Sequence, residues 1–114
     1  MEDCLFCKIV AGKIPSKKVF ENEYCFAFYD INPQAPVHIL VVSKVHTPNI
    51  IDAVENYSSS LLECMKAIKE IVKQEHLDEN GFRIVTNCGR DGCQSIDHLH
   101  FHILGGAQLS DKMS

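Results

Sequence analysis

The sequence predicts an α+β fold with an antiparallel sheet of about five strands, one main α-helix and a short N-terminal helix. Two observations support this fold class. Short segments of strand type recur along the chain, whereas only one long segment carries apolar residues at helical spacing. The strands also follow one another without the regularly intervening helices that a parallel sheet requires, which favours antiparallel pairing.

Length and composition limit the classes to which the protein can belong. With 114 residues, 46% hydrophobic and 23% charged, the chain is expected to form a single domain, residues 1–114. The formal net charge of −4 argues against nucleic acid as a partner. No apolar run is long enough to cross a membrane and the acidic N-terminus does not resemble a signal peptide, so we expect a cytoplasmic protein with reduced cysteines.

The first half of the chain is predicted to hold the short helix and three strands. Residues 5–11 form the helix, which Gly12 closes and Pro15 stops. A loop with two prolines follows the second strand, because proline cannot continue the hydrogen-bond ladder of a central strand. The strands are predicted at residues 18–21, 24–29 and 37–43, and the loop at residues 30–36.

The main helix is predicted over residues 61–75. Ser60 and Glu63 match the S-x-x-E capping pattern, in which each side chain satisfies a free amide at the helix start. The stretch before it contains Pro48 and shows no regular pattern. The apolar stripe of this helix, which we interpret as core, consists of Leu61, Met65, Ile68 and Val72.

Two strands enclose a loop in the last third of the chain. The first is predicted at residues 82–87 and the second at residues 97–104, where a pair of glycines ends it. The loop between them, residues 88–95, also contains two glycines, which permit close approach of the backbone to a ligand.

Three histidines alternate with apolar residues in the last strand. Because successive side chains in a strand point to opposite faces, His98, His100 and His102 share one face and the residues between them pack on the core. Alternate Cα atoms are roughly 6.6 Å apart, whereas zinc–nitrogen bonds measure only about 2.0–2.1 Å. A single tetrahedral metal bound by all three would be strained, so we expect the three histidines to have different tasks.

Several segments together resemble the histidine-triad (HIT) family of nucleotide hydrolases and transferases. H-L-H-F-H-I-L at residues 98–104 is similar to the family signature, and D-I-N-P-Q-A-P at residues 30–36 to its nucleotide loop. Asn87, D-G-C-Q-S at residues 91–95 and the glycine pair after the triad resemble the Hint-like, phosphoramidase-type branch. The matching pieces extend over nearly the whole chain.

The resemblance implies an enzyme that cleaves purine nucleoside 5′-phosphoramidates, or related adenylates such as aminoacyl-adenylates, at the α-phosphate. His100 would be the nucleophile and form a covalent nucleotidyl-histidine. A neutral imidazole suits this role near pH 7, because its ordinary pKa is about 6.5. His102 would hydrogen-bond the phosphate, Ser95 could protonate the leaving group, and His38 would support the triad from the neighbouring strand.

The resemblance also implies a nucleotide site for AMP, GMP or a derivative. Asp30 would bind the ribose hydroxyls, Asn87 would add a polar contact, and the loop with Gln94 and Ser95 would cradle the α-phosphate. Cys93 stands where the family often has a second glycine. Apolar candidates for the base pocket are Phe6, Ile9, Phe28 and Ile31.

A zinc site is expected by resemblance to bacterial members of the family. Their N-terminal C-x-x-C, here Cys4 and Cys7, joins two histidines that correspond to His46 and His98. Such a Cys₂His₂ set is typical of a closed, structural zinc site. No organic cofactor is expected, nor a divalent cation for catalysis, since amides and histidines can stabilise the phosphoryl charge.

Three alternative functions remain open. The chain could be a dinucleoside polyphosphate hydrolase, a weakly catalytic nucleotide-binding regulatory module, or a zinc hydrolase in which His98 and His100 hold a catalytic metal. By resemblance we expect a homodimer built on the main helix and the strand at residues 82–87. The chain has no tryptophan, whereas many Hint-branch proteins carry one in a C-terminal tail that reaches the partner's site.

Overall fold

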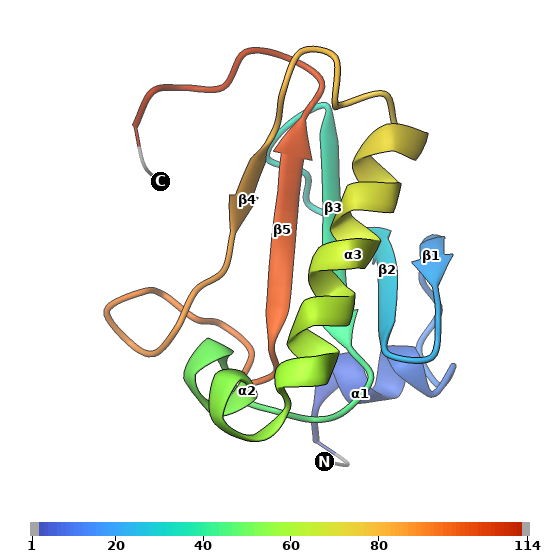
Figure 1. Ribbon diagram of the computed structural model, residues 1–114, viewed down its shortest axis with the longest axis vertical. Coiled ribbons are helices and arrows are strands. Elements are labelled where there is room, and N and C mark those ends of the chain that lie inside the picture. Colours follow the sequence, from blue (N-terminus) through green and yellow to red (C-terminus); the bar gives the residue numbers. More distant parts are fainter. Residues whose placement is uncertain (1–2, 113–114) are drawn as a thin grey trace.

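The computed structural model describes residues 3–112 and has the predicted α+β architecture (Figure 1). Its helices are α1 (Leu5–Val10), α2 (Ile50–Asn56) and α3 (Ser58–Gln74). Its strands are β1 (Lys18–Glu21), β2 (Cys25–Tyr29), β3 (Val37–Ser43), β4 (Arg83–Val85) and β5 (His100–Gly105). Within the described residues these strands form one antiparallel sheet in the order β1-β2-β3-β5-β4, which confirms the predicted fold class.

The central strand β3 divides the core into two parts. Its neighbours β2 and β5 pair with it along nearly its full length, so that Leu40 lies opposite both Phe28 and His102. Because side chains alternate, Ile39 and Val41 pack in the cluster beneath α3, whereas Leu40 and Val42 pack in a second cluster with Phe6 of α1. The sheet therefore carries apolar side chains on both faces.

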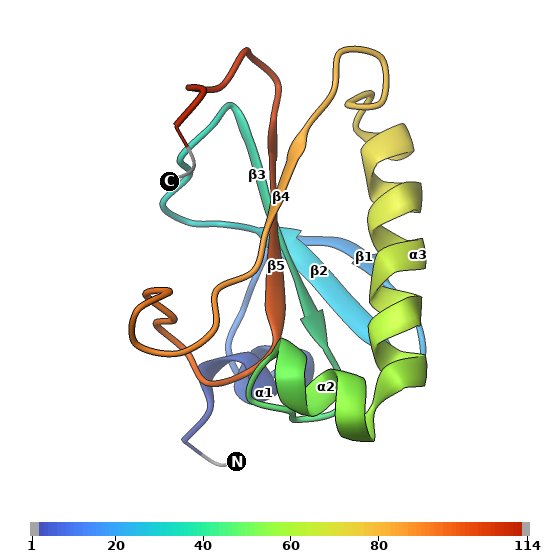
Figure 2. The same cartoon turned by 60° about the vertical axis from the view of Figure 1, so that its left-hand side comes forward.

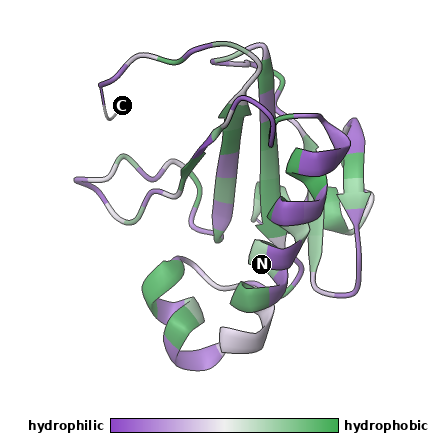
Figure 3. Ribbon diagram, turned by 45° about the horizontal axis from the view of Figure 1, so that its top comes forward, coloured by the Kyte–Doolittle hydropathy of each residue, from purple (hydrophilic) through white to green (hydrophobic). Residues whose placement is uncertain are grey.

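Helix α3 covers one face of the sheet, and α1 lies at the other side near one end (Figure 2). The centre of the sheet is green in Figure 3, whereas the long helix shows both green and purple residues, as an amphipathic helix does. The triad strand follows the predicted alternation here, since Leu99, Phe101 and Ile103 all belong to the α3-side cluster. The histidines between them are thereby directed to the α1 side of the sheet.

The start and the buried face of the main helix differ from the prediction. Helix α3 begins at Ser58, and Tyr57, its N-cap, makes no side-chain capping bond, so the predicted capping role of Ser60 and Glu63 is wrong. Met65 is 39% exposed, although Ile68 and Val72 are buried as expected. The buried stripe is rotated toward small residues, Cys64 and Ala67 among them, which let the helix approach the sheet closely.

Helix α2 was not predicted and lies in the stretch that contains Pro48. The Asn49 side chain accepts a hydrogen bond from the Asp52 amide at 3.1 Å and caps the helix. Only Tyr57 separates α2 from α3, and its amide still bonds to the carbonyl of Ala53 at 2.8 Å. The short length of α2 left too little periodicity to detect, but proline followed by asparagine and an acidic residue is a helix-start signal.

The two C-terminal strands are shorter than predicted. β4 covers only Arg83–Val85, and β5 begins at His100 rather than at residue 97. Before β5, the amide of Leu99 donates to the carbonyl of Thr47 at 2.7 Å, and the carbonyl of Leu99 accepts from the amide of Ser43 at 3.4 Å. The chain thus stays beside the end of β3 without forming a regular ladder. His98 therefore lies just outside the strand. Among the described residues, no helix is both long and apolar enough to cross a membrane.

Candidate functional site

A cavity of about 380 Å³ opens on the α1 side of the sheet. His100 and His102 of β5 form part of its wall, and Asp30 and Ser95 line it from two loops. Its apolar lining comes chiefly from α1 and β2 and includes all the residues predicted for a base pocket: Phe6, Ile9, Phe28 and Ile31. This combination of an apolar hollow and a few convergent polar groups is typical of a ligand site.

His100 is held in one tautomer by the backbone. Its ring is 4% exposed, and its Nδ1 lies 2.7 Å from the carbonyl oxygen of His98. Because a carbonyl can only accept, Nδ1 carries the proton and Nε2 keeps its lone pair. Burial lowers the pKa of His100 below its ordinary value, only partly offset by this hydrogen bond and by Asp30, so the ring is neutral near pH 7.

His102 and His38 form a second pair of imidazoles beside His100. His38 Nε2 lies 2.9 Å from His102 Nδ1, and Asp30 Oδ2 is 3.4 Å from the same His38 nitrogen. Burial, together with the neighbouring imidazoles of His100 and His38, lowers the pKa of His102 to about 4. Burial also lowers the pKa of His38, against the opposing effect of Asp30. Both rings are neutral near pH 7.

Four potential metal ligands meet at the N-terminus of α1. The ligand atoms of Cys4, Cys7, His46 and His98 all lie within 4.8 Å of one another. Cys4 Sγ is 3.2 Å from His98 Nδ1, and Cys7 Sγ is 3.2 Å from His46 Nδ1. Bond lengths of about 2.0–2.3 Å in a tetrahedral zinc site separate the ligand atoms by roughly 3.3–3.8 Å. The cluster therefore fits a tetrahedral ion closely.

His98 is oriented for this cluster by the backbone of β3. Its ring is fully buried, and its Nε2 donates to the carbonyl of Ser43 at 2.7 Å. Its Nδ1 thus keeps the lone pair that faces the two thiols. Burial and the adjacent Cys4 thiol raise the pKa of Cys7 to about 11, so an ion bound there would have to displace the thiol proton.

Phe6 lies between the Cys/His cluster and the cavity. Its buried ring meets the ring of His98 edge-on at a centroid distance of 5.8 Å and that of His100 at 4.9 Å. Phe6 is also part of the cavity wall and is flanked along α1 by Cys4 and Cys7. The same six-residue helix therefore serves the cluster and the cavity.

The loop at residues 88–95 is braced by its own side chains. Gln94 accepts from the amide of Gly89 at 2.9 Å and donates to the carbonyls of Pro48 and Ile96 at 2.6 and 3.0 Å. Asn87 donates to the carbonyl of Gly92 at 2.6 Å. Cys93, an exposed residue, is in the left-handed region at φ 60°. Of the residues predicted here, Ser95 reaches the cavity, whereas the side chains of Gln94 and Asn87 hold the loop in shape.

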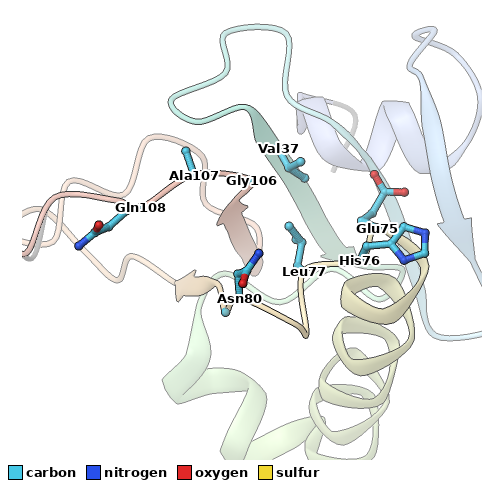
Figure 4. A pocket seen from close by; sticks show the side chains of 9 residues that line it. Val37, Glu75, His76, Leu77, Asn80, Gly106, Ala107 and Gln108 are labelled. Atoms are coloured by element: carbon cyan, nitrogen blue, oxygen red, sulfur yellow. The ribbon is translucent and has the colours of Figure 1, made fainter.

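A larger hollow, of about 690 Å³, lies at the opposite end of the sheet beside the C-terminal end of α3 (Figure 4). Glu75 and His76 are its titratable residues, and Glu75 already accepts a hydrogen bond from the Tyr29 hydroxyl at 2.8 Å. Its lining contains none of the triad residues. His100 and His102 line the smaller cavity instead.

Comparison with known proteins agrees with this geometry. The model of the HIT domain family matches residues 11–109 of the chain. The chain belongs to the HIT family. A 14 kDa zinc-binding protein from Brassica juncea is 44% identical to this HIT protein over 110 residues, which are 95% of this chain and 96% of that one.

Solved HIT structures share the whole fold. A HIT family hydrolase from Clostridium thermocellum is 38% identical, with a TM-score of 0.94 and coverage of 100% of this chain and 99% of that one. A histidine triad nucleotide-binding protein from Candida albicans is 31% identical, with a TM-score of 0.83 and coverage of 98% and 87%. This HIT protein thus resembles proteins whose names refer to hydrolysis, nucleotide binding and zinc binding.

Some residues of the HIT site could not be found from sequence patterns. Ser43 orients His98 through its main-chain carbonyl, which gives no signal in the side-chain pattern. Leu40 lines the cavity from β3, and only the pairing register places it opposite His102. Ile14, Pro15 and Ser16 complete the wall from the segment that leads into β1, and the proline was interpreted only as a helix stop.

Proposed function

We propose that this HIT protein hydrolyses purine nucleoside 5′-phosphoramidates or related adenylates through a covalent intermediate on His100. The tautomer of His100 carries the proposal most directly, because Nδ1 donates to the carbonyl of His98 and Nε2 is left as an unprotonated nucleophile in a cavity. The relation to a HIT family hydrolase and a nucleotide-binding protein adds support. The phosphoramidase branch is the finer part of the proposal and rests on the sequence motifs around residues 87–106.

The reaction takes two displacements at phosphorus. In the first, the Nε2 lone pair of His100 forms a bond to the α-phosphorus as the bond to the leaving nitrogen breaks, and the leaving amine takes up a proton. In the second, water attacks the same phosphorus, its proton returns to the group that protonated the amine, and the bond to His100 breaks to release the nucleoside monophosphate. His102 hydrogen-bonds the phosphoryl group throughout. We assign the transfer of the proton to the leaving group to Ser95, which lines the cavity.

The cavity lining supports a nucleotide as the ligand. We propose that the base lies among the apolar residues of α1 and β2, and that the carboxylate of Asp30 binds the ribose hydroxyls. In the phosphate loop, we assign the binding of the α-phosphate to the main-chain amides and to Ser95. Gln94 and Asn87 support this loop, since their side chains already bond to its backbone.

We propose that Cys4, Cys7, His46 and His98 bind a structural zinc ion. Support comes from the close fit of the four ligand atoms to a tetrahedron and from the zinc-binding relative. All four positions of a tetrahedral ion are then taken by the protein, so no position is left for a catalytic water. His100 lies outside the cluster, which counts against a zinc hydrolase that uses His98 and His100 together.

We also propose a homodimer that forms through β4 and the main helix α3. β4 is an edge strand of the described sheet, and Phe82 and Ile84 are at least one-third exposed at or beside it. Exposed edge strands with apolar side chains tend to pair with another strand. Helix α3 adds the exposed apolar residues Leu62 and Met65, and α2 adds Ile51 and Val54.

The enzyme proposal is tested by replacing the nucleophile. We expect His100→Asn to reduce hydrolysis of adenosine 5′-phosphoramidate by at least about 10³-fold in kcat, because the covalent route loses the nitrogen that bonds to phosphorus. His76→Asn is the matched control, since His76 is exposed, lies far from the cavity, and has φ 59°, which asparagine tolerates. Turnover by the His100→Asn variant at the rate of the control would refute the nucleophile assignment.

A further inference from the structure

The His38–His102 pair is part of a longer chain of hydrogen bonds that starts on the backbone. The amide of Gln34, in the loop between β2 and β3, donates to His38 Nδ1 at 3.0 Å. His38 Nε2 then lies 2.9 Å from His102 Nδ1. His38 is 5% exposed, so neither contact is replaced easily by water. The chain of bonds thus joins a main-chain N–H outside the cavity to an imidazole that lines it.

These contacts fix the proton positions of both rings. A main-chain N–H can only donate, so His38 Nδ1 must be the acceptor and the proton of the neutral ring is on Nε2. The carboxylate of Asp30, 3.4 Å from Nε2, can only accept and favours the same tautomer. His38 Nε2–H therefore donates to Nδ1 of His102, whose own proton must be on Nε2.

The proton positions also decide whether Asp30, His38 and His102 can bind a metal ion. Its ligand atoms lie within 4.8 Å of one another, close enough for a metal ion. A metal at His38 Nε2 would need a lone pair there, but a neutral imidazole that already accepts at Nδ1 has none to offer. The cluster is therefore arranged as a hydrogen-bond chain and not as a metal site.

We infer that the amide of Gln34 sets the tautomer of His102 by way of His38, so that His102 presents an N–H donor to the phosphoryl group. Gln34 acts as a positioning residue through its main chain, and the side chain is not required. The loop is suited to hold this amide in place, because Asp30 Oδ1 accepts from the Asn32 amide at 2.8 Å.

The opposite tautomer would defeat the proposed reaction. If His102 carried its proton on Nδ1, its Nε2 lone pair would face a phosphate whose oxygens are also acceptors, and the contact would be repulsive. His100 and His102 would then both present lone pairs to the same phosphoryl group. The inference rests on the proposed function for this consequence, whereas the tautomers themselves follow from the geometry alone.

The first test needs no substrate and no variant. In the full-length, zinc-loaded protein labelled with ¹⁵N, long-range imidazole correlations show which ring nitrogen of each histidine is protonated. We expect a protonated Nε2 and an unprotonated Nδ1 for both His38 and His102, together with a through-hydrogen-bond coupling between the Gln34 amide and His38 Nδ1. A protonated Nδ1 on either ring would overturn the inference whatever the activity of the protein.

The second test removes the amide proton. Gln34→Pro deletes the donor, whereas Gln34→Ala deletes the side chain and keeps the donor. We expect the proline variant to show mixed tautomers for His38 and His102 and a loss of at least about tenfold in kcat with adenosine 5′-phosphoramidate, with little change in KM. The alanine variant should keep the wild-type tautomers of both rings, because the main-chain donor remains.

Other outcomes separate the inference from the proposed function. Unchanged tautomers in a folded Gln34→Pro variant would refute the role of the amide. If proline disturbs the fold, an amide-to-ester replacement at Gln34 removes the same N–H without adding a ring, and unchanged tautomers there would be equally decisive against it. Inactivity of the wild-type protein toward phosphoramidates, with the expected tautomers in place, would refute the proposed function and leave the tautomer assignment standing.

Discussion

At the scale of single residues, hydrogen bonds to backbone carbonyls and amides orient each triad histidine differently. The carbonyl of Ser43 turns Nδ1 of His98 toward the thiols, and the carbonyl of His98 leaves Nε2 of His100 unprotonated. Strand spacing alone indicates only that the three rings should differ. The pairing register of β3 with β5 determines which ring nitrogen faces which partner. The amino-acid sequence alone does not reveal that register.

The lowered pKa of His102 predicts a loss of stability in acid. Its folded pKa is about 4 against an ordinary 6.5, so the unfolded chain binds a proton first as the pH falls. The free energy of unfolding should decrease as the pH falls from about 6.5 to 4, with a contribution from His102 of at most about 3 kcal/mol.

Urea unfolding at pH 7 and pH 4.5 checks this prediction, with His102→Gln as the comparison. Glutamine does not titrate, so the variant should lose less stability on acidification than the wild type, although other groups titrate in both proteins. His76→Asn, which replaces an exposed histidine outside the cavity lining, is the control. An equal acid-induced loss in wild type and His102→Gln would show that His102 is not held neutral by the fold.

At the scale of elements, α1 joins two sites that sequence motifs treat separately. Its cysteines belong to the four-residue cluster, while Phe6 and Ile9 between and beyond them line the cavity. A helix of six residues is too short to be stable without tertiary contacts. Metal binding should therefore order the wall of the nucleotide site.

Removal of one thiol tests this link. We expect Cys4→Ser to lower the zinc content well below one ion per chain and to weaken AMP binding by roughly tenfold, since one wall of the pocket loses its anchor. Metal analysis and calorimetric titration with AMP measure the two effects. Lys8→Ala, on α1 but outside both the cluster and the cavity lining, should retain both properties. Full AMP affinity in a zinc-free Cys4→Ser protein would contradict the coupling.

An element could be predicted from the sequence where its own residues and their immediate neighbours determine it. The apolar run of β3 and the proline-containing loop before it are local signals, and both were placed correctly. The start of α3 was misplaced because α2 leads into it almost without a break, so no separate cap at Ser60 is needed. For the site, the structure brings together the four predicted Cys and His residues and sets the predicted apolar residues around the cavity. The contacts of Gln94 and Asn87 depend on a loop conformation that only the fold defines.

At the scale of the whole molecule, the two faces of the sheet have different tasks. The α3 side contains the core in which Cys25 and Cys64 are fully buried, as expected for structural thiols. The α1 side carries the histidines, the Cys/His cluster and the cavity. This separation lets the reactive face contain buried polar groups while the opposite face supplies apolar packing.

The proposed dimer is a prediction about the whole molecule. Size-exclusion chromatography with light scattering should give twice the chain mass of 12.8 kDa. Ile84→Lys places a charge at the β4 edge and should shift the protein toward the monomer, whereas Tyr29→Lys, on β2 away from that edge, should not. A wild-type species of 12.8 kDa at all concentrations would rule the dimer out.

The central claim is that His100 attacks phosphorus and becomes covalently nucleotidylated. Rapid acid-free quenching of the reaction with adenosine 5′-phosphoramidate, followed by mass spectrometry of the intact protein and its peptides, observes this directly. The account predicts a mass increase of one adenylyl group, located on His100 and absent from His100→Asn. Steady turnover with no adduct at any quench time, or an adduct on a different residue, would contradict it.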